Sequence, residues 1–337
     1  MDHLLIIKPG SFGDIIHALP CASAVRRAFP KTKITWLVDE RWEPLLRNNP
    51  SVDETAVFPR QRFRGMAGKL RSLPWAFGLQ RLRPDTALDL QGLLRSGLMA
   101  RLSGARRIIG LSDAREGARL FHQERVPVGE TEHAVRRYLR SLAAFGLDPG
   151  GRVEFALPEG TLPARLAGIP PFILLHPYAR GSGKSLSESQ VIALCRLLAP
   201  HPVVLAGTGE IRESLPGNAI NLLNGTSIGE MVGAIRAARF VVSVDSGPMH
   251  IAAAVNPRLL SIHTWSDPRL VGPYCEDAWI WQAGKIQRQE LAGTTAGKGR
   301  QPQDRDIQEM ADFVKQTIAA PTAGHEPPQR ESAENGD

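Results

Sequence analysis

The residues best suited to chemistry lie where a buried strand is expected to end and a helix to begin. Phe240–Val244 is apolar enough for a buried strand, and Asp245–Pro248 breaks this pattern before an alanine-rich run at helical spacing. Asp or Ser can cap such a helix, and proline suits its first turn. The junction points free backbone N–H groups and the positive end of a helix dipole at one spot, which favours phosphate. Gly247 lets a ligand approach closely, although an ordinary strand-to-helix turn explains the same residues.

A second loop, Pro177–Ser185, also follows an expected strand and precedes an expected helix. Its Gly183-Lys184-Ser185 resembles the end of a P-loop, but the first glycine of that motif would fall at Tyr178. Tyrosine does not readily adopt a positive φ, which argues against a P-loop nucleoside triphosphatase. Lys184 on a glycine-rich loop remains suited to clamping a phosphate, and it is equally compatible with a solvated cation.

Asp14 follows a glycine-bearing loop at an expected helix start. Capping that helix is a sufficient structural reason for an aspartate at this place. A carboxylate at the mouth of a strand is also suited to taking a proton from a substrate hydroxyl. From the residues alone, capping is the simpler interpretation.

No metal site is expected from the sequence. His17, His176, His250 and His263 show no metal-ligand spacing, and Asp304–Asp306 suits the start of a helix. His250 lies one turn into the expected phosphate-facing helix, where contact with a ligand and packing in the core are equally open interpretations.

Strands and helices alternate along the chain, which predicts parallel sheets with helices on both faces. Expected strands are Leu4–Ile7, Ile34–Val38, Thr86–Asp89, Arg107–Ile109, Phe172–His176, Val203–Ala206, Phe240–Val244 and, as the last clear one, Leu259–His263. Expected helices are Ile15–Arg27, Leu93–Leu102, His133–Phe145 closed by Gly146, Ser187–Leu198, Ser227–Ala237 and about Asp306–Ile318. We expect an α/β protein with two Rossmann-like domains facing a cleft.

A stretch rich in proline and glycine divides these elements. It predicts a first domain over residues 1–150, a linker over 151–170 and a second domain over 171–320, followed by a disordered tail over 321–337. Ligands of such sheets bind beyond the carboxyl ends of the strands, where the candidate loops of both domains lie.

Composition narrows the function classes. No apolar run approaches the length that spans a bilayer, and no signal peptide is recognisable, so a cytoplasmic protein is expected. The net charge is +7, and Arg60–Arg119 holds thirteen Lys or Arg against four Asp or Glu. Such a region attracts anions. Aromatic residues do not interleave with it, so no nucleic-acid partner is expected. The three cysteines form no metal or disulfide pattern.

Four motifs in order resemble those of glycosyltransferase family 9, the ADP-heptose–lipopolysaccharide heptosyltransferases. They are Ile7–Pro20, Asp89–Ser96, Asp245–Ala254, and Ser266–Pro268 with Gly272–Tyr274. The resemblance covers roughly residues 4–285 and implies a GT-B fold, with the acceptor on the N-terminal domain and the nucleotide sugar on the C-terminal domain. It implies inverting transfer of a heptose to the Kdo/heptose inner core of lipopolysaccharide without a metal or other cofactor.

By this resemblance Asp14 is the general base that deprotonates the acceptor hydroxyl, and ADP is the leaving group. The implied donor-binding residues are Lys184, Glu210, Asp245, Ser246, Gly247, Pro248, Met249 and His250. The implied acceptor-binding residues are Ser11, Phe12, Gly13, Gln91 and Arg95. The acceptor is an anionic glycolipid, which gives the basic region a purpose and implies a peripheral place at the inner face of the inner membrane.

The chain departs from the family pattern near the expected donor pocket. Thr264-Trp265 stands where Gly-Pro is usual, and the lysine loop is longer and richer in glycine. A GT-B transferase that uses another nucleotide sugar or acceptor is therefore the alternative, and a binding or scaffold protein without activity is a further one.

Overall fold

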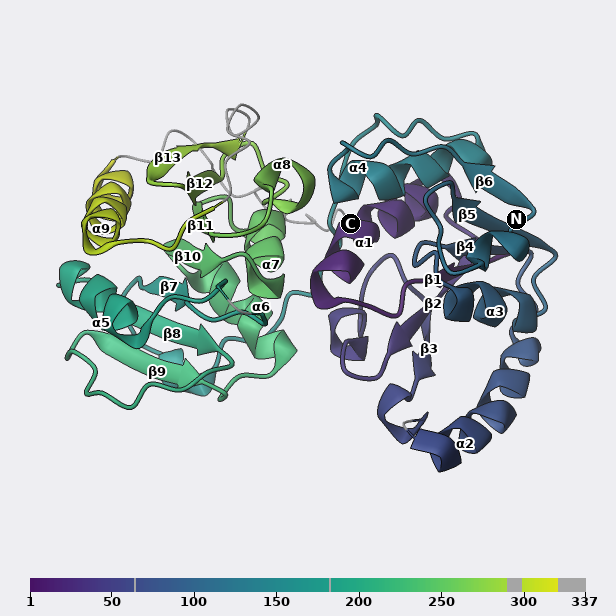
Figure 1. The fold of residues 1–337 in the computed structure, drawn as a ribbon, viewed down its shortest axis with the longest axis horizontal. Coiled ribbons are helices and arrows are strands. Elements are labelled where there is room, and N and C mark those ends of the chain that lie inside the picture. Colours follow the sequence, from purple (N-terminus) through teal and green to yellow (C-terminus); the bar gives the residue numbers. More distant parts are fainter. Residues whose placement is uncertain (64, 182, 290–298, 321–337) are drawn as a thin grey trace, which may run out of the picture.

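Two sheets, each covered by helices, make up the computed structural model, which describes residues 1–63, 65–181, 183–289 and 299–320 (Figure 1). The first sheet has six parallel strands in the order β3-β2-β1-β4-β5-β6. Its strands are β1 (His3–Ile7), β2 (Lys33–Asp39), β3 (Glu54–Phe58), β4 (Thr86–Asp89), β5 (Arg107–Leu111) and β6 (Glu124–Val126). This order is that of dinucleotide-binding Rossmann folds, with a switch point between β1 and β4.

The second sheet repeats that order and adds one antiparallel strand, giving β13-β12-β11-β10-β7-β8-β9. Its strands are β7 (Ile173–His176), β8 (Val203–Gly207), β9 (Ala219–Leu223), β10 (Phe240–Val244), β11 (Leu259–His263), β12 (Trp279–Gln282) and β13 (Lys285–Arg288). The switch point therefore lies between β7 and β10, so the loops after these two strands open onto the expected ligand crevice.

Helices cover both faces of each sheet because the strand residues are apolar on both sides. In β1, Leu4 and Ile6 belong to one apolar cluster with Ile16, while Leu5 and Ile7 belong to another. The helices of the first half are α1 (Phe12–Ala28), α2 (Gly65–Gly78), α3 (Leu94–Leu102) and α4 (Ala134–Leu139). Those of the second half are α5 (Glu188–Leu197), α6 (Ile228–Ala237), α7 (Gly247–Val255), α8 (Pro268–Val271) and α9 (Asp304–Ala319).

The two halves meet through α1 and α7, which face each other in Figure 1. One buried apolar cluster contains Ile16 of α1 and Met249 of α7, so the core continues across this contact. Helix α9 closes the second half by packing on α5. The expected tail, 321–337, lies outside the described residues. No helix in the described ranges combines the length and the hydropathy needed to cross a bilayer.

The structure confirms the expected strands and adds five others. Leu259–His263 is not the last strand, because the hairpin of β12 and β13 follows it. The unexpected strands lie toward the outer ends of their sheets, where β3 and β13 are partly exposed and lack a continuous apolar run. The helix expected over His133–Phe145 divides into α4 and a 3-10 helix, Arg140–Phe145, and Gly146 ends it with a φ of 73°.

Candidate active site

The loop between β1 and α1 holds Asp14 in a fixed orientation. Helix α1 begins at Phe12 with Ser11 as its N-cap, so Asp14 is the third helical residue rather than the cap itself. Its Oδ2 accepts hydrogen bonds from the backbone N–H and the hydroxyl of Ser11, both at 2.9 Å. The expected capping role is thus met from within the first turn, and one carboxylate oxygen is committed to it.

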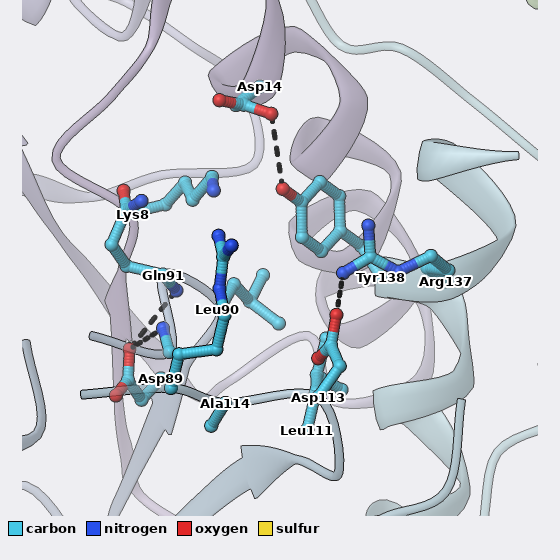
Figure 2. Close-up of a pocket in the computed structure, with 12 residues that line it drawn as sticks. Lys8, Asp14, Asp89, Leu90, Gln91, Leu111, Asp113, Ala114, Arg137 and Tyr138 are labelled. Carbon is cyan, nitrogen blue, oxygen red and sulfur yellow. Dashed lines mark hydrogen bonds and ion pairs between the residues drawn. The ribbon is translucent and has the colours of Figure 1, made fainter. Parts of the chain in front are cut away.

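The other carboxylate oxygen of Asp14 faces a buried polar cluster. The hydroxyl of Tyr138, on α4, donates to Asp14 Oδ1 over 3.3 Å, and the Nζ of Lys8 lies 4.8 Å from the Tyr138 ring centre (Figure 2). Lys8 ends up only 3% exposed. Burial raises the pKa of Asp14, but the Lys8 charge and the hydrogen bonds from Ser11 and Tyr138 outweigh it and keep that pKa below its usual value. Asp14 is therefore an anion at neutral pH.

A polar cavity of about 170 Å³ opens beside Asp14 at the carboxyl edge of the first sheet. Figure 2 shows Lys8, Gln91 and Arg137 around it, and Arg115 also lines it. The charged side chains that line it are mixed: three are cationic (Lys8, Arg115, Arg137) and three are carboxylates (Asp14, Asp89, Asp113). Arg137 is ion-paired with Asp113. The cationic side chains are suited to holding an anionic group of a ligand. Burial lowers the pKa of Lys8, because a desolvated ammonium group is less stable than a hydrated one.

The cavity wall on the β4 side is built by a fully buried carboxylate. Asp89 accepts the backbone N–H groups of Gln91 and Gly92, each at 3.0 Å, and contacts the Ser96 hydroxyl and His122 Nε2, also at 3.0 Å. These contacts fix the turn after β4. In the motif that begins at Asp89, the Asp89 side chain therefore fixes the wall of the cavity, and Gln91 lines the cavity.

The expected acceptor residues are only partly brought together. Gln91 lines the cavity and Ser11–Gly13 forms its neighbouring loop, whereas the Arg95 guanidinium lies over the Phe58 ring at 5.4 Å from its centre. Arg95 is absent from the cavity lining among the described residues. Sequence reasoning missed Lys8, Arg115, Arg137 and Tyr138. The only sequence signal was the position of Lys8 directly after a strand, since Tyr138 reaches the site from far along the chain.

The opposite wall of the crevice is the junction of β10 and α7. Ser246 is the N-cap of α7, and its hydroxyl contacts His176 Nδ1 at 3.1 Å and the Val244 carbonyl at 3.0 Å. Pro248 has no N–H, and the N–H of Met249 donates to the Ser246 carbonyl. The backbone donors available for an anion are therefore those of Ser246 and Gly247. Met249 is fully buried, so its side chain belongs to the core.

Lys184 reaches this junction from the loop after β7. Its Nζ lies 2.8 Å from Asp245 Oδ2 and 5.1 Å from the centre of the Trp265 ring. Lys184 is thus an ordered, ion-paired side chain and not a freely solvated cation. Glu210 is exposed on the loop that follows β8, one strand further along the sheet.

Direct contacts join the Asp14 loop to the start of α7. A Cβ atom on Gly247 would lie 2.0 Å from Phe12 Cδ1, and one on Gly13 would lie 2.6 Å from His250 Cδ2. His250 is 7% exposed and shares a hydrogen bond with His17. It is therefore a packed residue at the contact of the halves, where burial lowers its pKa to about 4. Asp14 and the expected phosphate site lie on the same side of the molecule.

Across the residues that the structure describes, no group of three or more His, Cys, Asp or Glu side chains is arranged to hold a metal ion. The site offers an ionised carboxylate in a polar cavity of mixed charge, on a helix that contacts α7. Lys184 lies beside the start of α7 through its contact with Asp245. This arrangement can deprotonate a hydroxyl on one side and stabilise a leaving anion on the other.

Solved structures share this architecture. Escherichia coli heptosyltransferase WaaC with ADP superposes with a TM-score of 0.74 at 24% identity, covering 94% of this chain and 99% of that one. E. coli ADP-heptose lps heptosyltransferase II superposes with a TM-score of 0.73 at 20% identity, covering 95% of this chain and 100% of that one. The fold is therefore GT-B, two Rossmann-like domains facing a crevice, as the sequence predicts.

Sequence comparison then fixes the family. Residues 77–296 match the model of glycosyltransferase family 9 (heptosyltransferase), and the chain belongs to this family. It is similar to lipopolysaccharide heptosyltransferase 1 of Pseudomonas aeruginosa, with 29% identity over 293 residues, 80% of this chain and 81% of that protein. The protein of that name from E. coli K12 is 27% identical over 307 residues, with 83% and 93% covered. The protein is a glycosyltransferase. The matched residues begin after the loop that carries Asp14.

Proposed function

We propose that this enzyme transfers a heptose from ADP-heptose to the inner core of a lipopolysaccharide acceptor. The names of its relatives support this substrate class, and one related E. coli structure contains ADP-2-deoxy-2-fluoro heptose. In this proposal residues 1–150 bind the acceptor, 151–170 link the domains, and 171–320 bind the nucleotide sugar.

One observation carries the mechanism: an anionic Asp14 lies between a polar cavity that contains three cationic side chains and the start of α7. An acceptor of inner-core type bears carboxylate and phosphate groups, which suit a cavity lined by Lys8, Arg115 and Arg137. With such a group held in the cavity, the acceptor hydroxyl comes within reach of the Asp14 carboxylate. Ser11 and Tyr138 orient that carboxylate and keep it ionised.

The proposed step is a displacement with inversion. Asp14 takes the proton of the acceptor hydroxyl while its oxygen forms a bond to the anomeric carbon of the donor sugar. The bond between that carbon and the diphosphate oxygen breaks, and its electron pair leaves with ADP. Because attack comes from the face opposite the leaving group, the configuration at the anomeric carbon inverts.

The departing ADP is stabilised by groups of the second half. Lys184 exchanges its contact with Asp245 for the diphosphate, and the N–H groups of Ser246 and Gly247 donate to it at the positive end of α7. These donors supply the charge that a divalent cation supplies in other transferases, so the proposed reaction needs no metal. A chelator should leave the rate unchanged.

Glu210 and Pro248 belong to the same proposal. Glu210 lies where a ribose would follow the diphosphate along the sheet edge, and Pro248 sets the first turn of α7. The lipid acceptor places the enzyme in the cytoplasm and at the inner face of the inner membrane.

The decisive experiment offers the purified enzyme ADP-heptose and a Kdo-bearing lipid A, and reads the products by mass spectrometry. We expect the acceptor to gain one heptose with release of ADP. A panel with UDP-, GDP- and other ADP-sugars tests the alternative that another donor is used. Product formed from one of these and none from ADP-heptose would replace the proposed donor, and the exposed Trp265 beside Lys184 is the feature that favours this alternative.

A further inference from the structure

Large apolar side chains that face solvent gather in one part of the first half. Of the nine exposed large hydrophobic residues found in the described ranges, five lie between Leu73 and Leu120. Leu94 and Leu98 are 48% and 44% exposed on α3, and Leu120 is 87% exposed on the 3-10 helix Ala118–Leu120. Leu73 and Phe77, on α2, are 52% and 61% exposed. Such clustering on a protein surface marks an interaction site.

Three of these side chains form a contiguous patch, which we name the leucine rim: Leu94, Leu98 and Leu120. Leu94 and Leu98 are one turn apart on α3 and share a face. A Cβ atom on Gly117 would lie 3.8 Å from Leu94 Cδ1 and 3.9 Å from Leu120 Cδ1, so the two leucines flank the same glycine. Helix α3 also contacts α2, which carries the other exposed apolar pair.

The leucine rim lies on helices that follow, within a few residues, the loops that form the polar cavity. Gln91 and Gly92 line the cavity three and two residues before Leu94, and Ala114 and Arg115 line it shortly before Gly117. The elements that carry the apolar patch are therefore continuous with the walls of the cavity in which the proposed acceptor binds. A glycan that is linked to a lipid needs such a surface beside its binding cavity.

Basic side chains are exposed on the elements that carry the patch and its neighbours. The stretch Arg60–Arg119 holds thirteen Lys or Arg against four Asp or Glu. Arg62, Arg71, Arg81 and Arg101 are exposed on or next to α2 and α3. Basic side chains near an interface are attracted to anionic headgroups, and exposed leucines insert at the boundary between headgroups and acyl chains.

We propose that the leucine rim, with the exposed face of α2 and the exposed arginines on or next to α2 and α3, docks on the surface of an anionic lipid bilayer. The acceptor glycan then enters the polar cavity directly from the membrane. Docking does not depend on turnover, so it can be tested apart from the proposed function.

The test is flotation of the full chain with vesicles of phosphatidylcholine, alone or mixed with phosphatidylglycerol. We expect binding to the mixed vesicles only, lowered by added salt. Leu98→Glu and Leu120→Glu should each weaken that binding about tenfold, because an exposed leucine that would insert into the bilayer is replaced by a charge. Leu162→Glu, at an exposed leucine outside the patch, is the matched control and should bind as the native protein does.

Native protein that fails to float with anionic vesicles, or Leu120→Glu that floats as well as Leu162→Glu, would overturn the proposal. Equal binding to pure phosphatidylcholine would also contradict it. Transfer to a water-soluble, delipidated acceptor should remain native in both rim variants. If the native protein itself transfers no sugar to the delipidated acceptor, that result counts against the proposed function and not against docking.

A separate observation concerns Trp265, whose side chain is 73% exposed on the loop after β11. Its ring lies 5.1 Å from Lys184 Nζ, and the neighbouring Thr264 hydroxyl donates to the Gly183 carbonyl at 2.6 Å. The loops after β7 and β11 are thus tied together beside the proposed diphosphate site. A large exposed aromatic ring at the carboxyl edge of a parallel sheet is placed to contact a ligand.

The order of the strands indicates which part of the donor the Trp265 ring contacts. Along the sheet edge, β8, β7, β10 and β11 are successive neighbours. Their loops carry, in turn, Glu210, Lys184, Ser246 and Trp265. With ribose at Glu210 and the diphosphate at Lys184 and Ser246, the sugar comes next, beside Trp265. Resting on the proposed function, we infer that the Trp265 ring stacks on an apolar C–H face of the transferred sugar and thereby sets donor preference.

The test separates the sugar from the nucleotide. Trp265→Ala should raise the KM for ADP-heptose about tenfold and leave the Kd for ADP unchanged, while Trp265→Phe should keep most of the native KM. If the affinity for ADP falls as much as that for ADP-heptose, the ring contacts the nucleotide and the inference is wrong. Unchanged values for both ligands would also overturn it. Native enzyme that shows no heptosyl transfer contradicts the proposed function itself.

Discussion

The Nε2 of His17 lies 3.0 Å from the Nδ1 of His250, and both side chains are buried. This hydrogen bond joins α1, which carries Asp14, to α7, whose first turn is the proposed phosphate site. Phe12 and Gly247 pack against each other next to it. The proposed base and the proposed leaving-group site are therefore positioned relative to each other by side chains of the two halves, and changes at this contact should affect transfer.

Gly247→Ala tests the contact directly. The added methyl would lie 2.0 Å from a ring carbon of Phe12, so the Phe12 ring, the first turn of α1 or the start of α7 must move. We expect kcat/KM to fall about 100-fold, since a displacement of roughly 1 Å has such an effect. Adding Phe12→Ala should recover part of the loss by making room. Gly229→Ala is the control, because a Cβ atom there meets nothing within 4 Å. An equal fall of kcat/KM in Gly229→Ala and Gly247→Ala would contradict the role of the contact.

Asp14→Asn should abolish transfer and leave ADP affinity nearly native, because the amide cannot accept the acceptor proton. Thermal shift with ADP measures binding, and product formation measures transfer. Asp113→Asn, at another carboxylate that lines the cavity, separates the loss of a base from the loss of charge. Transfer at the native rate by Asp14→Asn would show that another group is the base.

Lys184→Ala should weaken ADP binding by about 1–3 kcal/mol, the usual range for a hydrogen bond to a charged group. Titration calorimetry of the variant against the native protein measures this loss. Lys285→Ala, at an exposed lysine of β13, controls for net charge. If the Kd for ADP is the same in all three proteins, Lys184 does not bind the diphosphate.

Acid should destabilise the fold before the carboxylates titrate. Burial lowers the pKa of His133, His176, His250 and His263 to about 4 each. In the unfolded chain a histidine titrates near pH 6.5, so between about pH 6.5 and about 4 the unfolded state binds more protons. Stability should therefore fall as pH falls through this window, by about 1.4 kcal/mol per pH unit for each such histidine.

Urea unfolding at a series of pH values measures this slope. His263→Gln should reduce this slope by about 1.4 kcal/mol per pH unit, the contribution of one histidine, whatever its effect on stability at neutral pH. The lowered pKa of Asp14 adds a further loss only below its ordinary value, because a depressed carboxylate stabilises the fold until it is protonated. A free energy of unfolding that is constant from pH 7 to 5 would contradict the burial of neutral histidines.

The sequence was sufficient for the parts of the site that are local in the chain. The junction at Asp245–Pro248 and the helix start at Asp14 each follow from a strand, a break and a helical pattern within a few residues. Strand neighbours could be inferred as well, because alternating strands and helices leave few topologies. The partly exposed outer strands, such as β3 and β13, carry no continuous apolar signal and were missed.

The contacts that span long stretches of chain were not predictable. Tyr138 reaches Asp14 across 124 residues and His250 reaches His17 across 233, and no spacing rule connects them. Arg95 shows what a motif leaves open: its place in the motif predicts a contact with the acceptor, and the structure places its guanidinium over the Phe58 ring. Which side chains meet at a crevice depends on how two sheets are set against each other.

Tyr138→Phe tests how Asp14 is tuned. The Tyr138 hydroxyl donates to Asp14 Oδ1 and is one of the groups that lower the pKa of Asp14. Its removal should raise that pKa, and a base works only while ionised, so the acidic limb of the kcat/KM profile should move to higher pH. Tyr274→Phe, a tyrosine that packs on His133 instead, should leave the limb in place. A profile that loses height in Tyr138→Phe without moving along the pH axis would show that Tyr138 supports the fold and does not tune the base.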